Sequence, residues 1–293
     1  MGKGDAVAAD HEAVRAMHHA LNELRLGAQI TVGEGVAPDI NMLYVGETVG
    51  DGDEIAFDIA LDALECTKSV AFGRSNAMAV LAIASRGDLY RPPARYLHKI
   101  AVGPDAKGAI DLSLSVEENL GRVAETKGYK VSDLTVVVLD RERHAELIES
   151  IRKTGARVHL IPDGDVAAAI ATALPGTGID LLMGTGGSAA GVLAAAALRC
   201  LGGEIHTRLA PVDQKEIDYL KSNGQADLNR MFRAGDLARG NDMLFAATGV
   251  TDGDILNGVA YRGDGATTHS LVLNNKSKTR RFVVTEHYFD TDI

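Results

Sequence analysis

Between residues 134 and 201 the chain alternates between short apolar runs typical of strands and longer stretches typical of helices. The expected strands cover residues 134–139, 157–161 and 179–183, and the expected helices cover residues 143–153, 166–174 and 188–201. Such alternation is typical of a parallel or mixed sheet whose faces are covered by helices. This part of the sequence therefore predicts the α/β fold class.

The rest of the chain carries helices and strands in a less regular, α+β order. Val14, Met17, Leu21 and Leu24 have helical spacing within residues 9–24. A Ser-x-x-Glu capping box predicts a second helix over residues 115–126, and strand patterns cover 29–32, 56–61, 76–85, 99–102, 242–247, 269–273 and 281–288. We predict an α+β domain over residues 1–130 and an α/β domain over residues 131–293.

Composition excludes several classes of function. The formal net charge of −10 argues against nonspecific binding to nucleic acid, which requires a basic face. No run approaches the roughly 18–20 apolar residues of a membrane span, and the N-terminus lacks the apolar centre of a signal peptide. Two cysteines cannot form a disulfide framework, and buried thiols suit a reducing compartment. We therefore expect a cytoplasmic protein with no membrane and no nucleic-acid partner.

Two acidic residues follow the apolar run at residues 56–61. Asp62 and Glu65 are three residues apart at an expected strand end, where both carboxylates can face one divalent cation. The Leu64 carbonyl could join them, and the Thr67 hydroxyl would lie beside whatever the cation holds. Hard cations such as Mg²⁺ prefer oxygen ligands and often bind phosphate as well. The alternative interpretation is a turn with solvent-exposed acids.

Two further acids lie at expected element ends in the first half. Glu34 lies between Gly33 and Gly35, which permit unusual backbone angles and close approach. Asp10 precedes the expected first helix. The alternatives are an N-cap for Asp10 and an exposed turn acid for Glu34. Together with Asp62 and Glu65, these carboxylates predict an oxygen-rich site for Mg²⁺ or Mn²⁺.

Polar residues of the second half cluster where expected strands end. Asp163 and Asp165 follow the strand at 157–161, where ligands collect in an open α/β sheet, and could accept hydrogen bonds from sugar hydroxyls. The alternative for Asp165 is a helix cap. Arg141 and Arg143 follow the strand at 134–139, and their planar guanidinium groups match phosphate oxygens. The alternative for this pair is an ordinary surface location.

The remaining patterns are weaker. The glycine-rich segment 184–188 lies between a strand and a helix, a place that suits an anion, but it has neither P-loop nor dinucleotide-binding spacing. Tyr96 could contact substrate, although an isolated tyrosine is more often a packing residue. The nine histidines lack His-Glu-x-x-His spacing, and no Gly-x-Ser-x-Gly is present. A zinc site and a serine hydrolase of that type are therefore not expected.

As a set, short sequence motifs along nearly the whole chain indicate common ancestry with a known family. They cover residues 33–35, 42–47, 62–67, 76–80, 99–104, 161–167, 186–187, 247–254 and 267–270. In this order they resemble the class II fructose-1,6-bisphosphatases. The resemblance implies the layered αβαβα sandwich of the lithium-sensitive sugar phosphatases. It also implies Mg²⁺- or Mn²⁺-dependent hydrolysis of the 1-phosphate of fructose 1,6-bisphosphate, in some relatives also of sedoheptulose 1,7-bisphosphate. A homodimer or homotetramer is implied as well.

The resemblance assigns roles to individual residues of this chain. The implied metal ligands are Asp10, Glu34, Asp62 and Glu65. Thr67, with Glu65, would act in catalysis by helping to position the attacking water. Thr67 is also one of the implied substrate contacts. The full set is Thr67, Tyr96, Arg141, Arg143, Asp163, Asp165 and Gly187.

The chain departs from the family pattern at positions close to the chemistry. Ala6 stands where the family has a lysine, Cys66 where it has a glycine, and Ala190 where it has a metal-binding glutamate. An expected aspartate is replaced by Pro38 or displaced to Asp39. These changes motivate two alternatives to a bisphosphatase. One is a catalytically weakened paralogue that binds or senses sugar phosphates, and the other is an enzyme for a different phosphate ester.

Overall fold

A computed structural model describes residues 1–289, and the chain forms two compact units. The first unit comprises Met1–Leu89 together with the chain from Gly240 onward, and the second comprises Tyr90–Arg239. This division differs from the predicted boundary at residue 130, which falls inside the second unit. The reason is non-local pairing, because the C-terminal strands add to the sheet begun by the N-terminal ones. Strand periodicity carries no information about such partners.

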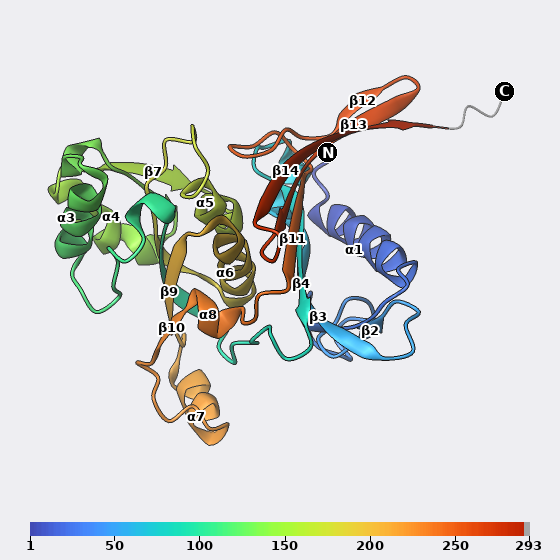
Figure 1. The fold of residues 1–293 in the computed structure, drawn as a ribbon, viewed down its shortest axis with the longest axis horizontal. Helices are drawn as coiled ribbons and strands as arrows, with labels where there is room; N and C mark the ends of the chain where they lie inside the picture. Colours follow the sequence, from blue (N-terminus) through green and yellow to red (C-terminus); the bar gives the residue numbers. More distant parts are fainter. Residues whose placement is uncertain (290–293) are drawn as a thin grey trace. The chain divides into compact units, whose positions relative to one another are not determined.

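The first unit is built on one mixed sheet of eight strands (Figure 1). The strand order is β12-β13-β11-β4-β3-β1-β2, and β14 pairs with the other side of β13. All neighbours are antiparallel except β1 and β3, which are parallel. The strands are β1 (Gly27–Val32), β2 (Thr48–Val49), β3 (Ile55–Glu65), β4 (Met78–Ser85), β11 (Met243–Gly249), β12 (Ala260–Arg262), β13 (Gly265–Asn274) and β14 (Thr279–Tyr288).

Helix α1 (Ala6–Asn22) lies alongside this sheet (Figure 1). Its apolar stripe, including Val14 and Leu21, packs in one core cluster with Ile30 and Ile59. The helix begins earlier than its apolar pattern, because Asp5 is the N-cap and its side chain accepts a hydrogen bond from the Ala8 N–H at 2.9 Å. Asp10 therefore lies inside the helix, and the N-cap alternative for this residue is wrong.

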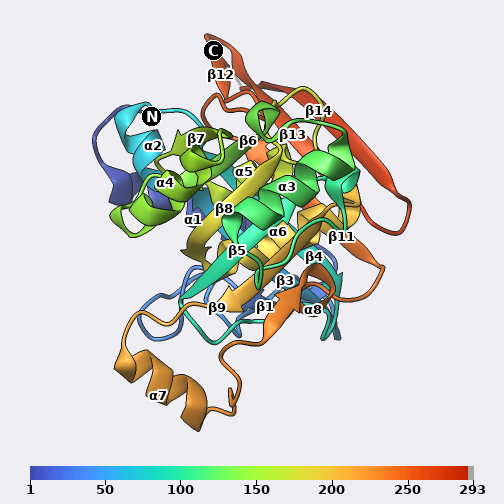
Figure 2. The same ribbon diagram turned by 90° about the vertical axis from the view of Figure 1, so that its left-hand side faces the viewer.

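The second unit is built on a six-stranded mixed sheet in the order β10-β9-β5-β8-β6-β7. Figure 2 shows α3 and α4 in front of this sheet and α6 behind it. The strands are β5 (Tyr96–Val102), β6 (Thr135–Leu139), β7 (Arg157–Ile161), β8 (Leu181–Gly187), β9 (Glu204–Leu209) and β10 (Met231–Arg233). The α-helices are α3 (Val116–Lys127), α4 (Ala145–Lys153), α5 (Asp165–Ala171), α6 (Ser188–Leu201), α7 (Gln214–Ser222) and α8 (Ala234–Leu237). The predicted α/β class is confirmed.

Most predicted elements form close to their predicted ends. The strand at 157–161 and the helix at 188–201 match the structure, and Ser115 makes the predicted capping box with Glu118. The sequence analysis missed β9 and α7 for opposite reasons. In β9 the buried residues include the polar His206 and Thr207, which hide its strand pattern. In α7 Leu220 is the one buried residue, so the helix has no buried apolar stripe that a sequence pattern could reveal.

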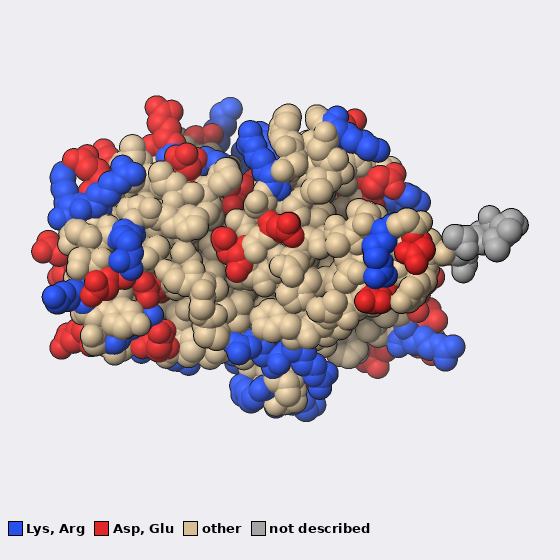
Figure 3. Space-filling view, turned by 90° about the horizontal axis from the view of Figure 1, so that it is seen from above, with Lys and Arg blue, Asp and Glu red and all other residues tan. Residues whose placement is uncertain are grey.

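The structure also bears on the excluded partners. Within residues 1–289 no helix is both long enough and apolar enough to cross a membrane. Acidic and basic side chains are interspersed over much of the face shown in Figure 3, and basic ones gather at its lower edge.

Candidate functional site

The end of β3 brings the two central carboxylates to the same face of the sheet. In a regular strand, residues three apart point to opposite faces. Here Asp62 lies opposite Val80 and Glu65 opposite Met78, so three steps along β3 match two along β4. This bulge shifts the side-chain alternation by one residue, as bulges beside active sites often do. Asp62 is half-buried and Glu65 is 6% exposed, so the alternative of solvent-exposed turn acids is wrong.

The loop after β1 brings Glu34 to the same strand. Its Oε1 accepts a hydrogen bond of 2.7 Å from the Ala63 N–H, between Asp62 and Leu64 of β3. The backbone on either side is held by the segment 43–45: the Glu34 N–H donates to the Leu43 carbonyl at 3.0 Å. A Cβ on Gly33 would lie 2.2 Å from that carbonyl oxygen. Glycine is therefore required beside Glu34 because of close backbone approach.

Helix α1 supplies the fourth carboxylate. The Thr67 hydroxyl, on the first residue of α2 (Thr67–Phe72), lies 3.4 Å from Asp10 Oδ1 and 3.1 Å from the Leu64 carbonyl oxygen. The Leu64 oxygen, considered above as a possible metal ligand, thus accepts from Thr67. Burial raises the pKa of Glu34; the hydrogen bond from Ala63 opposes this shift, and the negative charge of Asp10 adds to it.

These contacts tie Asp10 and Glu34 to the end of β3 without completing a metal centre. Across residues 1–289, no group of three or more His, Cys, Asp or Glu side chains is arranged to hold a metal ion. The donor chemistry nevertheless fits a hard cation, because the predicted ligands are carboxylates and a threonine hydroxyl lies beside Asp10. A bound cation would also offset the burial and repulsion that raise the pKa of Glu34. The ligand set Asp10, Glu34, Asp62 and Glu65 therefore stays a prediction.

In the second unit, sheet topology collects the predicted substrate residues at one edge. Strands β6, β7 and β8 are parallel, so their carboxyl ends meet there, and the antiparallel β5 begins there. Each strand brings predicted residues to this edge. They are Tyr96 at the start of β5, Arg141 and Arg143 after β6, Asp163 and Asp165 after β7, and Gly187 at the end of β8. Tyr96 and Gly187 lie directly opposite each other in the β5–β8 pair.

The two arginines are held differently. Arg143 donates to the Thr185 carbonyl from Nη2 at 2.7 Å, and its guanidinium lies 5.4 Å from the centre of the Tyr96 ring. Arg141 lies 3.9 Å from Asp163 Oδ1, and both side chains are substantially exposed. These contacts orient both guanidinium groups at the sheet edge and leave further N–H groups to bind an anion.

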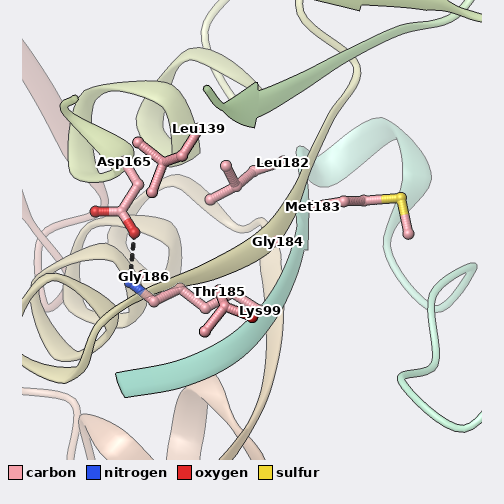
Figure 4. Close-up of a pocket in the computed structure, with 8 residues that line it drawn as sticks. All are labelled: Lys99, Leu139, Asp165, Leu182, Met183, Gly184, Thr185 and Gly186. Carbon is pink, nitrogen blue, oxygen red and sulfur yellow. Dashed lines mark hydrogen bonds and ion pairs between the residues drawn. The ribbon is translucent and has the colours of Figure 1, made fainter. Parts of the chain in front are cut away.

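A buried ion pair lies beneath this edge (Figure 4). Lys99 Nζ is 2.6 Å from Asp165 Oδ2, and the two side chains are 2% and 10% exposed. A Cβ on Gly186 would lie 1.9 Å from Asp165 Oδ2, so this glycine makes room for the pair. Asp165 is the first residue of α5, and Gly164 is the N-cap, so the cap alternative for Asp165 is wrong. Because Lys99 binds its carboxylate, we expect Asp165 to position β8, with Asp163 better placed for sugar hydroxyls.

His144 is a second residue that the sequence analysis did not identify. Its Nδ1 lies 2.7 Å from the Leu139 carbonyl oxygen and its Nε2 lies 2.8 Å from the Thr185 nitrogen. Nδ1 therefore carries the proton and Nε2 accepts from the Thr185 N–H. Burial lowers the pKa of His144; the Leu139 hydrogen bond opposes this shift, and Arg143 and Arg141 reinforce it. The neutral imidazole thus connects the end of β6 to the glycine-rich end of β8.

We expect His144 to make the folded state sensitive to mild acid. Above the unfolded pKa of about 6.5, histidine is neutral in both states and adds no pH dependence. Below that value the unfolded chain takes up a proton that the folded chain resists, so the free energy of unfolding falls as pH decreases, by at most about 1.4 kcal/mol per pH unit for one histidine. Urea denaturation from pH 7.5 to 5.5 should show this fall.

The matched variant is His144→Gln, which cannot titrate in this range. The pH dependence should be smaller in the variant by the contribution of His144. Some pH dependence of the free energy of unfolding should remain in the variant, because burial also lowers the pKa of His98. Identical pH profiles for the two proteins would contradict the assigned role of His144.

The residues that depart from the family pattern occupy ordered positions. Ala6 is the first residue of α1, and Ala190 is half-buried in the first turn of α6. Cys66, the N-cap of α2, has φ 66° and ψ 44°, the left-handed conformation that favours glycine. In a residue other than glycine, this conformation is less stable than the right-handed one by roughly 1–2 kcal/mol. The buried Cys66 side chain partly offsets this cost by packing with Leu64 and Val70.

Comparison with known proteins identifies relatives along the whole chain. The model of a family described as "Bacterial fructose-1,6-bisphosphatase, glpX-encoded" matches residues 1–287. The chain is 44% identical over 315 aligned positions to a "D-fructose 1,6-bisphosphatase class 2/sedoheptulose 1,7-bisphosphatase" of Synechococcus sp. (strain JA-3-3Ab). It is 40% identical over 303 positions to "Fructose-1,6-bisphosphatase 1 class 2" of Escherichia coli (strain K12). Each alignment covers 99% of this chain and 90% of the relative.

Proposed function

Because the chain belongs to the glpX-encoded family of bacterial fructose-1,6-bisphosphatases, we propose that it hydrolyses the 1-phosphate of fructose 1,6-bisphosphate with the aid of Mg²⁺ or Mn²⁺. The products are a sugar monophosphate and inorganic phosphate. The observation that carries this proposal is the bulge in β3, which puts Asp62 and Glu65 on one face of the sheet. Both residues belong to the motif at residues 62–67 that resembles the family. Sedoheptulose 1,7-bisphosphate is a second candidate substrate, because the Synechococcus relative carries that name too.

In this proposal the first unit supplies the chemical groups. Asp10, Glu34, Asp62 and Glu65 hold the cation, which when bound polarises the phosphate and neutralises developing charge. The Thr67 hydroxyl helps to position the attacking water, and its contacts with Asp10 and Leu64 limit its rotation. The negative charge of Asp10 helps to raise the pKa of Glu34, and a bound divalent cation would offset that repulsion.

The second unit supplies substrate recognition. Arg141 and Arg143 bind phosphate oxygens, Asp163 accepts from sugar hydroxyls, and Tyr96 and Gly187 lie against the sugar phosphate. Their common location at one sheet edge supports this assignment. Asp165 contributes by holding Lys99 beneath Gly186, which lies next to Gly187 in β8.

Phosphate release from fructose 1,6-bisphosphate in the presence of Mg²⁺ or Mn²⁺ tests the proposal. We expect turnover that a chelator abolishes and that added Mn²⁺ restores. Tight binding of the sugar bisphosphate in a calorimetric titration without turnover would instead favour the weakened, regulatory paralogue. Turnover of other phosphate esters but of neither sugar bisphosphate would favour the third interpretation.

Two broader properties belong to the same proposal. We place the enzyme in the cytoplasm, because two cysteines cannot form a disulfide framework and its proposed substrate class is metabolic. We also propose that it forms a homo-oligomer, as the family resemblance implies.

A further inference from the structure

Strand β14 forms an exposed edge of the sheet in the first unit. Among residues 1–289 it pairs with β13 alone, over its full length (Figure 1). Nine of its ten residues are exposed, and they include large apolar side chains: Phe282 is 48% exposed, Val284 67% and Tyr288 70%. A long edge strand with exposed apolar residues is a template for pairing with another strand.

The register shows which backbone groups of β14 are available. The Phe289 N–H donates to the Asp264 carbonyl, directly opposite, and this fixes which pairs exchange hydrogen bonds with β13. Because hydrogen-bonded and non-hydrogen-bonded pairs alternate, odd-numbered residues of β14 bond to β13 and even-numbered residues point their N–H and C=O groups outward. The Asn275 N–H, which donates to the Met243 carbonyl in β11, agrees with this alternation.

We propose that β14 pairs antiparallel with β14 of a second copy of this chain, which joins two sheets across a twofold axis at Val283. In such a pair, even-numbered residues of one strand must lie opposite even-numbered residues of the other. Only then do the outward N–H groups of each strand face the outward C=O groups of its partner. Among the registers that meet this condition, one places Arg280 opposite the partner's Glu286. It also places Phe282 opposite the partner's Val284, on the face of the sheet that carries the buried Leu271.

Charge distribution selects the partner and the direction. Arg280 and Arg281 lie near one end of β14 and Glu286 near the other. Antiparallel self-pairing therefore matches unlike charges at both ends, whereas parallel pairing would align like charges. Unlike charges opposite each other stabilise a strand pair and like charges destabilise it. An unrelated strand would need the same charge order, whereas a second copy carries it necessarily.

The first experiment uses charge reversal in the full chain. Sedimentation equilibrium should show that Arg280→Glu weakens the dimer by about tenfold or more, because each dimer contains the pair twice. Glu286→Arg should act similarly, and the double variant should restore most of the wild-type affinity. Arg281→Glu is the matched control, since Arg281 lies opposite the partner's Thr285 on the other face and its reversal should matter less.

The second experiment fixes the register by cross-linking in a Cys200→Ser background. Val283→Cys places two thiols in a non-hydrogen-bonded pair at the twofold axis, with Cα atoms about 4.5 Å apart, within the range for a disulfide. Mild oxidation should convert this variant to a covalent dimer faster than Val284→Cys. A monomeric wild type, an oligomer insensitive to the Arg280 and Glu286 reversals, or faster cross-linking at 284 would each overturn the proposal. None of these readouts depends on phosphatase activity.

Discussion

Asp62→Asn is expected to lower kcat for phosphate release from fructose 1,6-bisphosphate by about 10²–10³-fold, the scale of losing one preorganised electrostatic group. The substitution keeps the size of the side chain and its capacity to accept from the Leu64 N–H, which now lies 3.1 Å from Asp62 Oδ1. It removes the negative charge that the proposed cation requires. The loss should therefore be only partly recovered by excess Mn²⁺. Steady-state kinetics across a Mn²⁺ titration measure it.

Asp53→Asn is the matched control for this variant. Asp53 is an exposed aspartate just before the other end of β3, so its substitution changes the net charge equally without touching the proposed site. Unchanged kcat in Asp62→Asn, with a folded protein, would remove Asp62 from the ligand set. Equal losses in the two variants would mean that overall charge, not the site, controls the rate.

Lys99→Met should lower the free energy of unfolding by about 3–5 kcal/mol, because it leaves the Asp165 carboxylate without its buried cation. The Lys99 side chain is 2% exposed and that of Asp165 is 10% exposed, so water cannot readily replace the lost partner. Methionine has a similar length and apolar character, so the effect reports on charge more than on volume. Urea denaturation monitored by circular dichroism measures the change.

A double-mutant cycle separates the ion pair from the packing of its parts. Lys99→Met combined with Asp165→Asn should be less destabilising than Lys99→Met alone, because no uncompensated charge remains. Lys107→Met, at an exposed position, should change stability by no more than about 0.5 kcal/mol. Additive effects of the Lys99 and Asp165 substitutions would show that the two residues do not interact.

The ion pair also shows why part of the site escaped the sequence analysis. Lys99 directly precedes the apolar run at residues 100–102 and is buried with it, and a buried charged residue requires a partner. That signal was present in the sequence, but the identity of the partner was not. Asp165 lies on another element, and only the packing of α5 against β5 and β8 brings its carboxylate to Lys99. His144 was similarly invisible, because its two hydrogen bonds go to backbone atoms.

The carboxylates of the first unit illustrate the opposite case. The spacing of Asp62 and Glu65 indicated a shared ligand, although a regular strand would have sent them to opposite faces. The bulge against Val80 and Met78 resolves this conflict, and no periodicity rule predicts where a bulge will occur. Asp10 was assigned to a helix start from its apolar pattern, but the cap was Asp5, five residues earlier in the chain.

Local patterns in the sequence determined most of the strands and helices of this protein, its α/β class and its membership of a phosphatase family. Those properties depend on side-chain periodicity, capping residues and short motifs, each of which spans only a few neighbouring residues. Tertiary structure alone decided the two-unit division, the bulge, the Lys99–Asp165 pair and the open edge at β14. Each of these arises where segments distant in sequence meet, and the energies of burial and strand pairing that select such meetings are properties of the whole fold.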